Sequence, residues 1–158
     1  KFRTHGGYFT DLDAHRKSIL EADTERLLRF LGYQMWTAKS DPPTDRLYYR
    51  YEGMEYRLTT RQGNTTHYKP DFHLWDHGVH TLWESKGFMD ERSKQRLTLM
   101  AKQYPEISVT LITKQELDAR KAEVLYKARR TGPMVLDIPC WGKPQTAKPP
   151  TDAQFPKG

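Results

Sequence analysis

The sequence predicts an α/β fold in which a central mixed β-sheet is flanked by helices. The chain has 158 residues, which suits one domain with a core of its own. Its apolar residues fall into segments with a helical period and into short segments rich in Tyr and Thr. These segments follow one another as helix, several strands, helix, strand, helix, an order typical of helices packed on a mixed sheet.

The N-terminal part is expected to hold one helix, between residues 12 and 32. Its leucines fall on one broad face, Asp13 is the candidate N-cap, and Gly32 ends the helical pattern. Residues 1–13 are polar and contain two glycines, so we expect a loosely ordered arm there. A short strand is expected to follow the helix at residues 33–36.

The middle of the chain is expected to supply most of the strands. Residues 47–51 and 54–60 flank Glu52-Gly53 and predict a hairpin, with a further turn at residues 61–66. Residues 68–75 and 79–86 predict two neighbouring strands, because a tight turn, Asp76-His77-Gly78, lies between them.

The C-terminal half predicts two helices and a strand. The helices are expected from residue 90 to about residue 104, where Pro105 follows, and over residues 115–130. Residues 107–112 are apolar enough for a fully buried strand, and residues 134–138 suggest an edge strand. We therefore expect one domain over residues 1–141, followed by a tail rich in Pro and Lys at residues 142–158 that has too few apolar residues to fold.

Composition narrows the class of partner. The chain carries 26 Lys and Arg against 20 Asp and Glu, a net charge of +6, which favours a polyanion such as nucleic acid. A single cysteine, Cys140, excludes an intrachain disulfide and fits a reducing compartment, so we expect a cytoplasmic protein. No apolar segment approaches the ~20 residues that span a bilayer, so a membrane partner is not expected.

Three residues on the two neighbouring strands predict a catalytic site. Asp71 follows Pro70 at the start of the first strand, while Glu84 and Lys86 are two residues apart on the second and share a face. Two converging carboxylates suit Mg²⁺, a hard cation that prefers oxygen ligands, and a neighbouring lysine can orient an attacking water. We expect Mg²⁺-dependent phosphodiester hydrolysis, with Mn²⁺ able to replace Mg²⁺.

A third carboxylate would allow a second metal ion to bind. Glu21 is the candidate, because it lies on the expected first helix beside apolar residues that face the core. Glu25 lies one turn later on the same face and is its competitor. The backbone carbonyl of Ser85 is expected as a further metal ligand between Glu84 and Lys86.

Basic residues after the catalytic strand are candidates for phosphate contacts. Four of them lie on the helix that begins near residue 90: Arg92, Lys94, Arg96 and Lys102. His73 shares the strand face of Asp71 and is expected to line the site near the phosphate. A zinc site among the histidines of this region is not favoured, because partner residues at motif spacing are absent.

The spacing of these residues resembles that of the PD-(D/E)xK nuclease superfamily: Pro70-Asp71, twelve intervening residues, then Glu84-x-Lys86. Residues 67–112 look most like bacteriophage endonuclease I, the Holliday-junction-resolving type. The similar segments are Tyr68-Lys69-Pro70-Asp71-Phe72, Glu84-Ser85-Lys86-Gly87, the basic helix, Tyr104-Pro105-Glu106 and the strand that follows. The helical glutamate of that family matches Glu21. Residues 37–66 are longer than in that family, and residues after 113 have no counterpart in it.

The resemblance implies a restriction-endonuclease-like core and a metal-dependent endonuclease that acts on DNA. It further implies branched DNA, such as Holliday junctions, as the substrate, and a homodimer, because resolution needs two coordinated sites. Such an enzyme would act in the host cytoplasm if a phage encodes it. Two alternatives stay open: a transposase-type or other DNA-end-processing endonuclease, and a DNA-binding or assembly module that shares the fold but has lost turnover.

Overall fold

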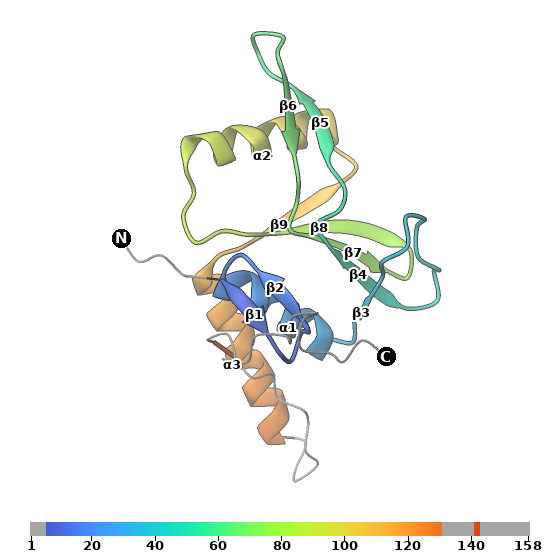
Figure 1. Ribbon diagram of the computed structural model, residues 1–158, viewed down its shortest axis with the longest axis vertical. Helices are drawn as coiled ribbons and strands as arrows, with labels where there is room; N and C mark the ends of the chain where they lie inside the picture. The colour runs from blue at the N-terminus through green and yellow to red at the C-terminus, as the bar shows by residue number, and fades with distance from the viewer. Residues whose placement is uncertain (1–5, 131–140, 143–158) are drawn as a thin grey trace, which may run out of the picture.

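A five-stranded mixed sheet forms the centre of the protein, with helices on its two faces (Figure 1). The computed structural model describes residues 6–130 and 141–142. The strand order in the sheet is β3-β4-β7-β8-β9. These strands are β3 (Gln34–Met35), β4 (Leu47–Tyr51), β7 (Phe72–Asp76), β8 (Val79–Ser85) and β9 (Ser108–Ile112). The α/β class and the mixed central sheet are as the sequence predicts.

Strand direction alternates in the middle of the sheet and not at its ends. β3 is parallel to β4 and β8 is parallel to β9, while β7 is antiparallel to both of its neighbours. The β7–β8 hairpin turns at His77 and Gly78, whose φ angles are 48° and 87°. Glycine suits such a turn because it has no Cβ to clash at positive φ. The turn at residues 76–78 and the strand expected over residues 79–86 are confirmed.

Two helices cover one face of the sheet. They are α1 (Ile19–Phe30) and α3 (Lys114–Arg130). Leu27 and Leu28 of α1 and Leu117 and Val124 of α3 pack on Phe72 and its neighbours in the sheet. The apolar faces of both helices therefore contribute to the largest of the three hydrophobic clusters in the described part of the chain.

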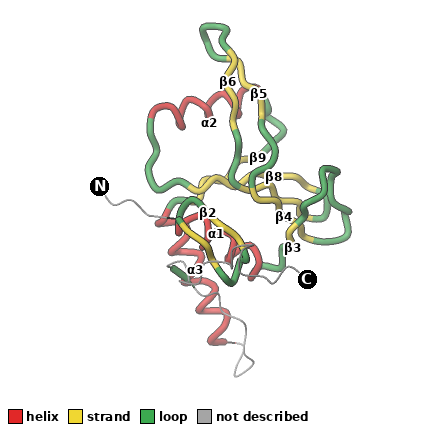
Figure 2. Tube along the Cα trace, in the orientation of Figure 1, coloured by secondary structure: helices red, strands yellow, loops and turns green. Residues whose placement is uncertain are grey.

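The opposite face is covered by α2 (Glu91–Gln103) together with a separate hairpin of β5 (Tyr56–Thr59) and β6 (Thr65–Tyr68). Leu58 and Tyr68 of the hairpin and Met100 of α2 pack against Leu82 of β8. The hairpin and α2 lie side by side and project away from the sheet (Figure 2). We refer to α2 and the β5–β6 hairpin as the upper lobe.

The N-terminal region differs from the expected loose arm. Residues in it form a hairpin of β1 (Gly7–Phe9) and β2 (Ala14–Arg16), which packs on α1 through the buried Phe9. Asp13 lies in the hairpin turn with a φ of 50°, and the hydroxyl of Tyr8 donates to its carboxylate. Asp13 therefore does not cap the helix. The N-cap is Ser18, and α1 starts seven residues later than the predicted first residue, Leu12.

The hairpin expected about Glu52-Gly53 does not form. β4 pairs with β3 and β7 in the central sheet, whereas β5 pairs with β6. Glu52 and Gly53 have positive φ angles of 53° and 88°, and the chain leaves the central sheet at this bend. The backbone N–H of Glu52 then donates to the carbonyl of Asp71 at 2.7 Å instead of to a hairpin partner.

The strand expected over residues 68–75 is two strands. β6 ends at Tyr68 and β7 begins at Phe72, with Pro70 between them. Proline has no N–H to donate to a ladder, so the chain changes direction there and enters a second sheet. Asp71 is left just before the first residue of β7, at the end of the central sheet.

The last strand and the helices near it lie close to their predicted bounds. β9 is at the edge of the sheet, and only Ile112 is fully buried in it, so the expectation of a fully buried strand is wrong. The expected strand at residues 134–138 lies outside the described residues, as does the expected tail apart from Gly142. The backbone of Gly142 bonds to Asp23 and Arg26 of α1. Among the described helices, none has the length and apolar character to cross a membrane.

Candidate active site

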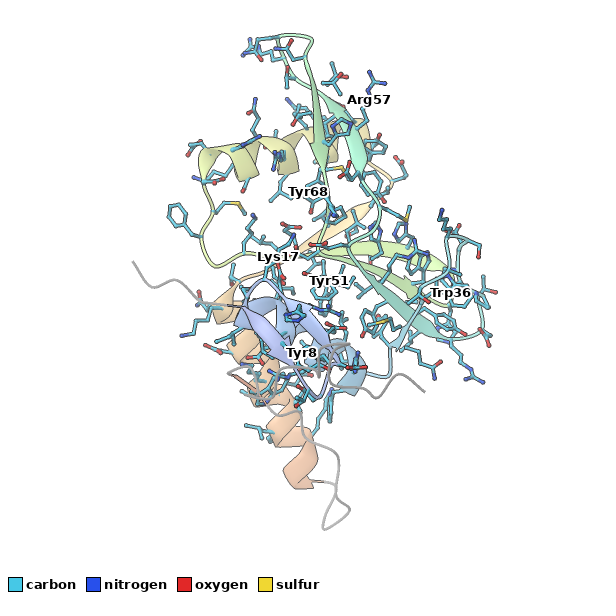
Figure 3. All side chains as sticks on the ribbon, in the orientation of Figure 1. Tyr8, Lys17, Trp36, Tyr51, Arg57 and Tyr68 are labelled. Atoms are coloured by element: carbon cyan, nitrogen blue, oxygen red, sulfur yellow. The ribbon has the colours of Figure 1, made fainter. Side chains whose placement is uncertain are left out.

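A cleft of about 410 Å³ lies between the central sheet, the start of α1 and the upper lobe. Glu21, Asp71, Glu84 and Lys86 all line it, so the structure brings the four expected catalytic residues together. Figure 3 marks the region with Lys17, Tyr51 and Tyr68, which lie between the N-terminal hairpin and the upper lobe. The cleft is thus formed where strands of two sheets end.

Asp71 and Glu84 are joined through the backbone of neighbouring strands. The backbone N–H of Ser85 donates to Asp71 Oδ2 at 2.8 Å, and the N–H of Asp71 donates to Glu84 Oε2 at 3.3 Å. Both side chains are buried, with 9% of Asp71 and 6% of Glu84 exposed. Main-chain groups therefore help to fix both carboxylates.

Lys86 lies beside Glu84 on the same side of the chain. Its Nζ is 3.8 Å from Glu84 Oε1, and its side chain is 32% exposed. The hydroxyl of Tyr68, the last residue of β6, donates to the other carboxylate oxygen of Glu84 at 2.9 Å. Glu84 is thus held between a tyrosine of the upper lobe and a lysine that faces the cleft.

Glu21 reaches the cleft from the first turn of α1. Its backbone N–H donates to Ser18 Oγ at 3.1 Å, which caps the helix. Its Oε2 accepts hydrogen bonds from the hydroxyl of Tyr51 at 2.8 Å and from the backbone N–H of Lys17 at 3.1 Å. The carboxylate is therefore oriented from both sides.

Glu25, the competitor of Glu21, has a structural role. It is fully buried and accepts two hydrogen bonds from Arg16, at 2.5 and 2.9 Å, and one from Tyr49 at 2.7 Å. A buried carboxylate needs such partners, and removing one of them is costly. The geometry thus selects Glu21 as the helical carboxylate of the cleft.

The electrostatics of the cleft disfavour three ionised carboxylates. Burial, and after it the negative charges of Glu84 and Glu21, raise the pKa of Asp71 to about 8, even though the Ser85 N–H and Lys86 act in the opposite direction. Burial also raises the pKa of Glu84. A cation placed among these groups would lower both pKa values and stabilise the ionised forms.

The described residues do not form a complete metal cage. Within residues 6–130 and 141–142, no three His, Cys, Asp or Glu side chains are arranged as a metal site. Mg²⁺ does not require one, because it is commonly held by one or two carboxylates and several waters. The buried Asp71 and Glu84 pair, which lacks a full positive counter-charge, fits that mode of binding.

Of the basic residues expected to contact DNA, the structure brings only Arg96 to the cleft. Arg92 and Lys102 are exposed on α2 away from it, and Lys94 pairs with Glu91 at 3.1 Å. The Nε of Arg96 is buried and has no hydrogen-bond partner among the described residues. An unsatisfied buried donor is unfavourable, so Arg96 is a ready partner for an anion.

His73 lies elsewhere than expected, whereas Ser85 follows Glu84 at the end of β8. His73 is fully buried, and its ring stacks between those of Tyr56 and His80, so it does not reach the cleft. Burial lowers its pKa to about 4, which keeps the ring neutral at pH 7. The Ser85 side chain points to α1, where its Oγ is 3.2 Å from Thr24 Oγ1. The contribution of Ser85 that the structure shows is the N–H that holds Asp71.

Two lysines of the cleft were missed from the sequence. Lys17 and Lys69 line it, and both pair with Glu52, at 2.6 and 3.4 Å respectively. Lys69 lies inside the motif that identified Asp71, so its place near the site could have been predicted from the sequence. Lys17 gave none, because the β1–β2 hairpin that places it next to Glu21 was not predicted.

Comparison with other proteins adds no relative from which a role could be transferred. No protein-family model, curated protein or solved structure matches the chain. The chemistry of the cleft is therefore inferred from its own side chains: the carboxylates of Glu21, Asp71 and Glu84, with Lys86 beside Glu84 and further cations in the lining.

Proposed function

We propose that the chain is a Mg²⁺-dependent DNA endonuclease with a restriction-endonuclease-like core. The observation that supports this most is the meeting of Glu21, Asp71, Glu84 and Lys86 in one cleft. They come from α1, from the segment before β7, from β8 and from the residue after it. Buried like charges destabilise a fold, so gathering acidic groups at one point indicates a site that binds a cation.

Asp71 and Glu84 would hold the metal ion, and Glu21 would support a second one. The Ser85 backbone carbonyl is a further candidate ligand. When bound, Mg²⁺ supplies an acidified water and neutralises the charge that develops on the phosphate, and Mn²⁺ would serve in the same way.

The side chains around the metal site have separate tasks. Lys86 orients the attacking water or stabilises the negative charge of the phosphate, since it lies beside Glu84 on the open side of the cleft. The water oxygen forms a bond to phosphorus while the bond from phosphorus to the leaving sugar oxygen breaks. Lys17, Lys69 and Arg96 would bind the neighbouring phosphates of the strand.

Branched DNA is the substrate we propose to test first. It is the substrate of the family that the motif resembles, and two coordinated cuts would require a homodimer. End-processing of the transposase type uses the same chemistry on a different DNA structure. The choice between them therefore depends on which DNA is cut, not on the catalytic residues.

The test compares cleavage of supercoiled plasmid and of a four-way junction with Mg²⁺, with Mn²⁺ and with EDTA. We expect the wild type to cut with either metal and not with EDTA. Asp71→Ala and Lys86→Ala should each lower the rate by about 10²-fold or more, the effect of removing one group that stabilises a transition state. Lys102→Ala removes a similar charge outside the cleft and should cut like the wild type. If the Asp71 and Lys86 variants cut like the wild type, the site is wrong.

A DNA-binding or assembly module without turnover is the second candidate. The observation in its favour is that no complete three-ligand metal group occurs among the described residues. This candidate predicts that the wild type binds the plasmid and the junction with Mg²⁺ or Mn²⁺ present and cuts neither.

A further inference from the structure

Phe88 is the most exposed large apolar side chain in the described part of the chain, with 82% of it accessible to solvent. A phenyl ring in water contributes nothing to the core, and burying one is worth about 1.5–3 kcal/mol. The next most exposed large apolar side chain, Val79, is 65% exposed and lies at the opposite end of β8. The exposure of Phe88 therefore indicates a role in binding and not in the core.

Phe88 lies in the loop between two segments that line the cleft, although its own side chain is not part of the lining. It lies two residues after Lys86, and two residues span at most about 7 Å. On its other side, α2 begins at Glu91, and Ser93 and Arg96 of that helix line the cleft. The space beside the loop is open, because a Cβ added at Gly87 would meet nothing within 4 Å.

The cations of the cleft indicate how a DNA strand would lie. Lys17, Lys69 and Arg96 line it. The Nε of Arg96 has no hydrogen-bond partner among the described residues, and a phosphate oxygen could accept its hydrogen bond. With the phosphate chain held there, the bases of the strand point away from the carboxylates. The loop that carries Phe88 would then lie beside this strand, next to the phosphate bound near Lys86.

We propose that Phe88 stacks on an unpaired base next to the phosphate that is cut. In a paired duplex each base is covered by its neighbours, so an exposed ring finds no free face. At a branch point, a bulge or a single-stranded segment a base is free to stack, and base–aromatic stacking tolerates any sequence. The inference rests on the proposed DNA substrate and narrows it to DNA with unpaired bases beside the cut. A single ring is too small for a protein-docking surface, which needs about 800 Å² per partner.

The test measures DNA binding in EDTA, where no cutting occurs. The probes are a duplex with a three-nucleotide bulge containing 2-aminopurine and the fully paired duplex of the same sequence. Phe88→Ala should weaken binding of the bulged probe by about 5- to 150-fold and remove the fluorescence change that stacking causes. Binding of the paired duplex should not change. Phe88→Trp should keep the wild-type behaviour, and Val79→Ala is the control for loss of an exposed apolar side chain.

The outcomes separate this inference from the proposed function. The inference is overturned if Phe88→Ala binds both probes as tightly as the wild type does, or if the substitution lowers the affinity for both probes equally. This holds even if the enzyme cuts DNA. If the preference for the bulged probe depends on Phe88 but no substrate is cut with Mg²⁺ or Mn²⁺, stacking stands and the endonuclease activity fails. Because Phe88 is exposed, thermal unfolding of Phe88→Ala should match that of the wild type.

Discussion

At the scale of single residues, each carboxylate that we propose as catalytic has a hydrogen-bond partner that orients it. Tyr51 donates to Glu21, Tyr68 donates to Glu84, and the Ser85 N–H donates to Asp71. Burial and the neighbouring carboxylates raise the pKa values of both tyrosines, so each remains a donor at any pH at which the protein is folded. Groups of this kind tune a metal site nearly as strongly as the ligands do.

Tyr68→Phe tests that dependence. The substitution removes the donor to Glu84 and keeps the ring, which is packed against Leu82 and Met100. We expect the apparent Mg²⁺ affinity or the cleavage rate to fall by about 10- to 100-fold. Cleavage measured over a range of Mg²⁺ concentrations provides the readout, with thermal unfolding as a check on the fold. Tyr104→Phe is the matched control, since it removes a hydroxyl bonded to the Arg57 carbonyl at 3.0 Å. Equal behaviour of the two variants would contradict a role for Tyr68.

Asp71 should make the stability of the metal-free protein depend on pH. Its pKa is 3.8 when unperturbed and about 8 in the folded chain, so the folded state binds more protons between these values. The free energy of unfolding should therefore fall as pH rises from about 4 to about 8. Asp71→Asn cannot ionise and should lose much of this fall, becoming more stable than the wild type at pH 8. Urea unfolding in EDTA at pH 5, 6.5 and 8 measures it, and parallel curves for the two proteins would refute it.

At the scale of elements, prediction from sequence succeeded where periodicity was strong and the partners were local. β8, α2 and α3 begin and end within a residue or two of the expected positions. The β1–β2 hairpin was missed, because strands of three residues show too little alternation to be distinguished from a polar loop. The break at Pro70 was missed because the apolar pattern of residues 68–75 continues across it.

Strand pairing also depended on information that local sequence lacks. Tyr-rich segments before and after Glu52 look like one hairpin, yet β4 pairs with β3 and β7. β7 does not follow β4 directly in the chain, so no local sequence pattern indicates that the two strands pair. The same limit decides which residues of the cleft could be predicted. Asp71, Glu84 and Lys86 were predictable because one turn joins their strands, whereas Lys17 was not.

The N-cap of α1 links an element to the site. Ser18→Ala removes the acceptor of the Glu21 N–H and should lower the free energy of unfolding by about 0.5–2 kcal/mol. Because Glu21 lies in that first turn, we also expect cleavage to slow. Thr113→Ala is the control, since Thr113 Oγ1 accepts from the Glu116 N–H at the start of α3 and Thr113 is not among the residues that line the cleft. Chemical unfolding and cleavage rates should show a similar loss of stability in both and a loss of activity in Ser18→Ala alone.

At the scale of the whole molecule, the cleft separates two parts that each bring positive charge to it. Lys17 comes from the side of the N-terminal hairpin and α1, and Lys69 and Arg96 come from the side of the upper lobe. The lining of the cleft thus combines four cationic side chains with four carboxylates: Lys17, Lys69, Lys86 and Arg96, and Glu21, Glu55, Asp71 and Glu84. In the proposed function, these cations would bind a phosphate chain next to the carboxylates that would hold the metal.

The dependence of DNA binding on salt should therefore report the cleft and not the total charge. Each phosphate contact adds about −0.9 to the slope of log K against log salt concentration for duplex DNA, and about −0.7 for a single strand. Lys69→Ala should make the slope shallower by about that amount, because Lys69 lines the cleft. Lys102→Ala removes the same charge from the exposed part of α2 and should leave the slope unchanged. Fluorescence anisotropy of a labelled junction in EDTA over a series of salt concentrations gives both slopes. If the two variants shift the slope equally, the phosphate chain does not run through the cleft.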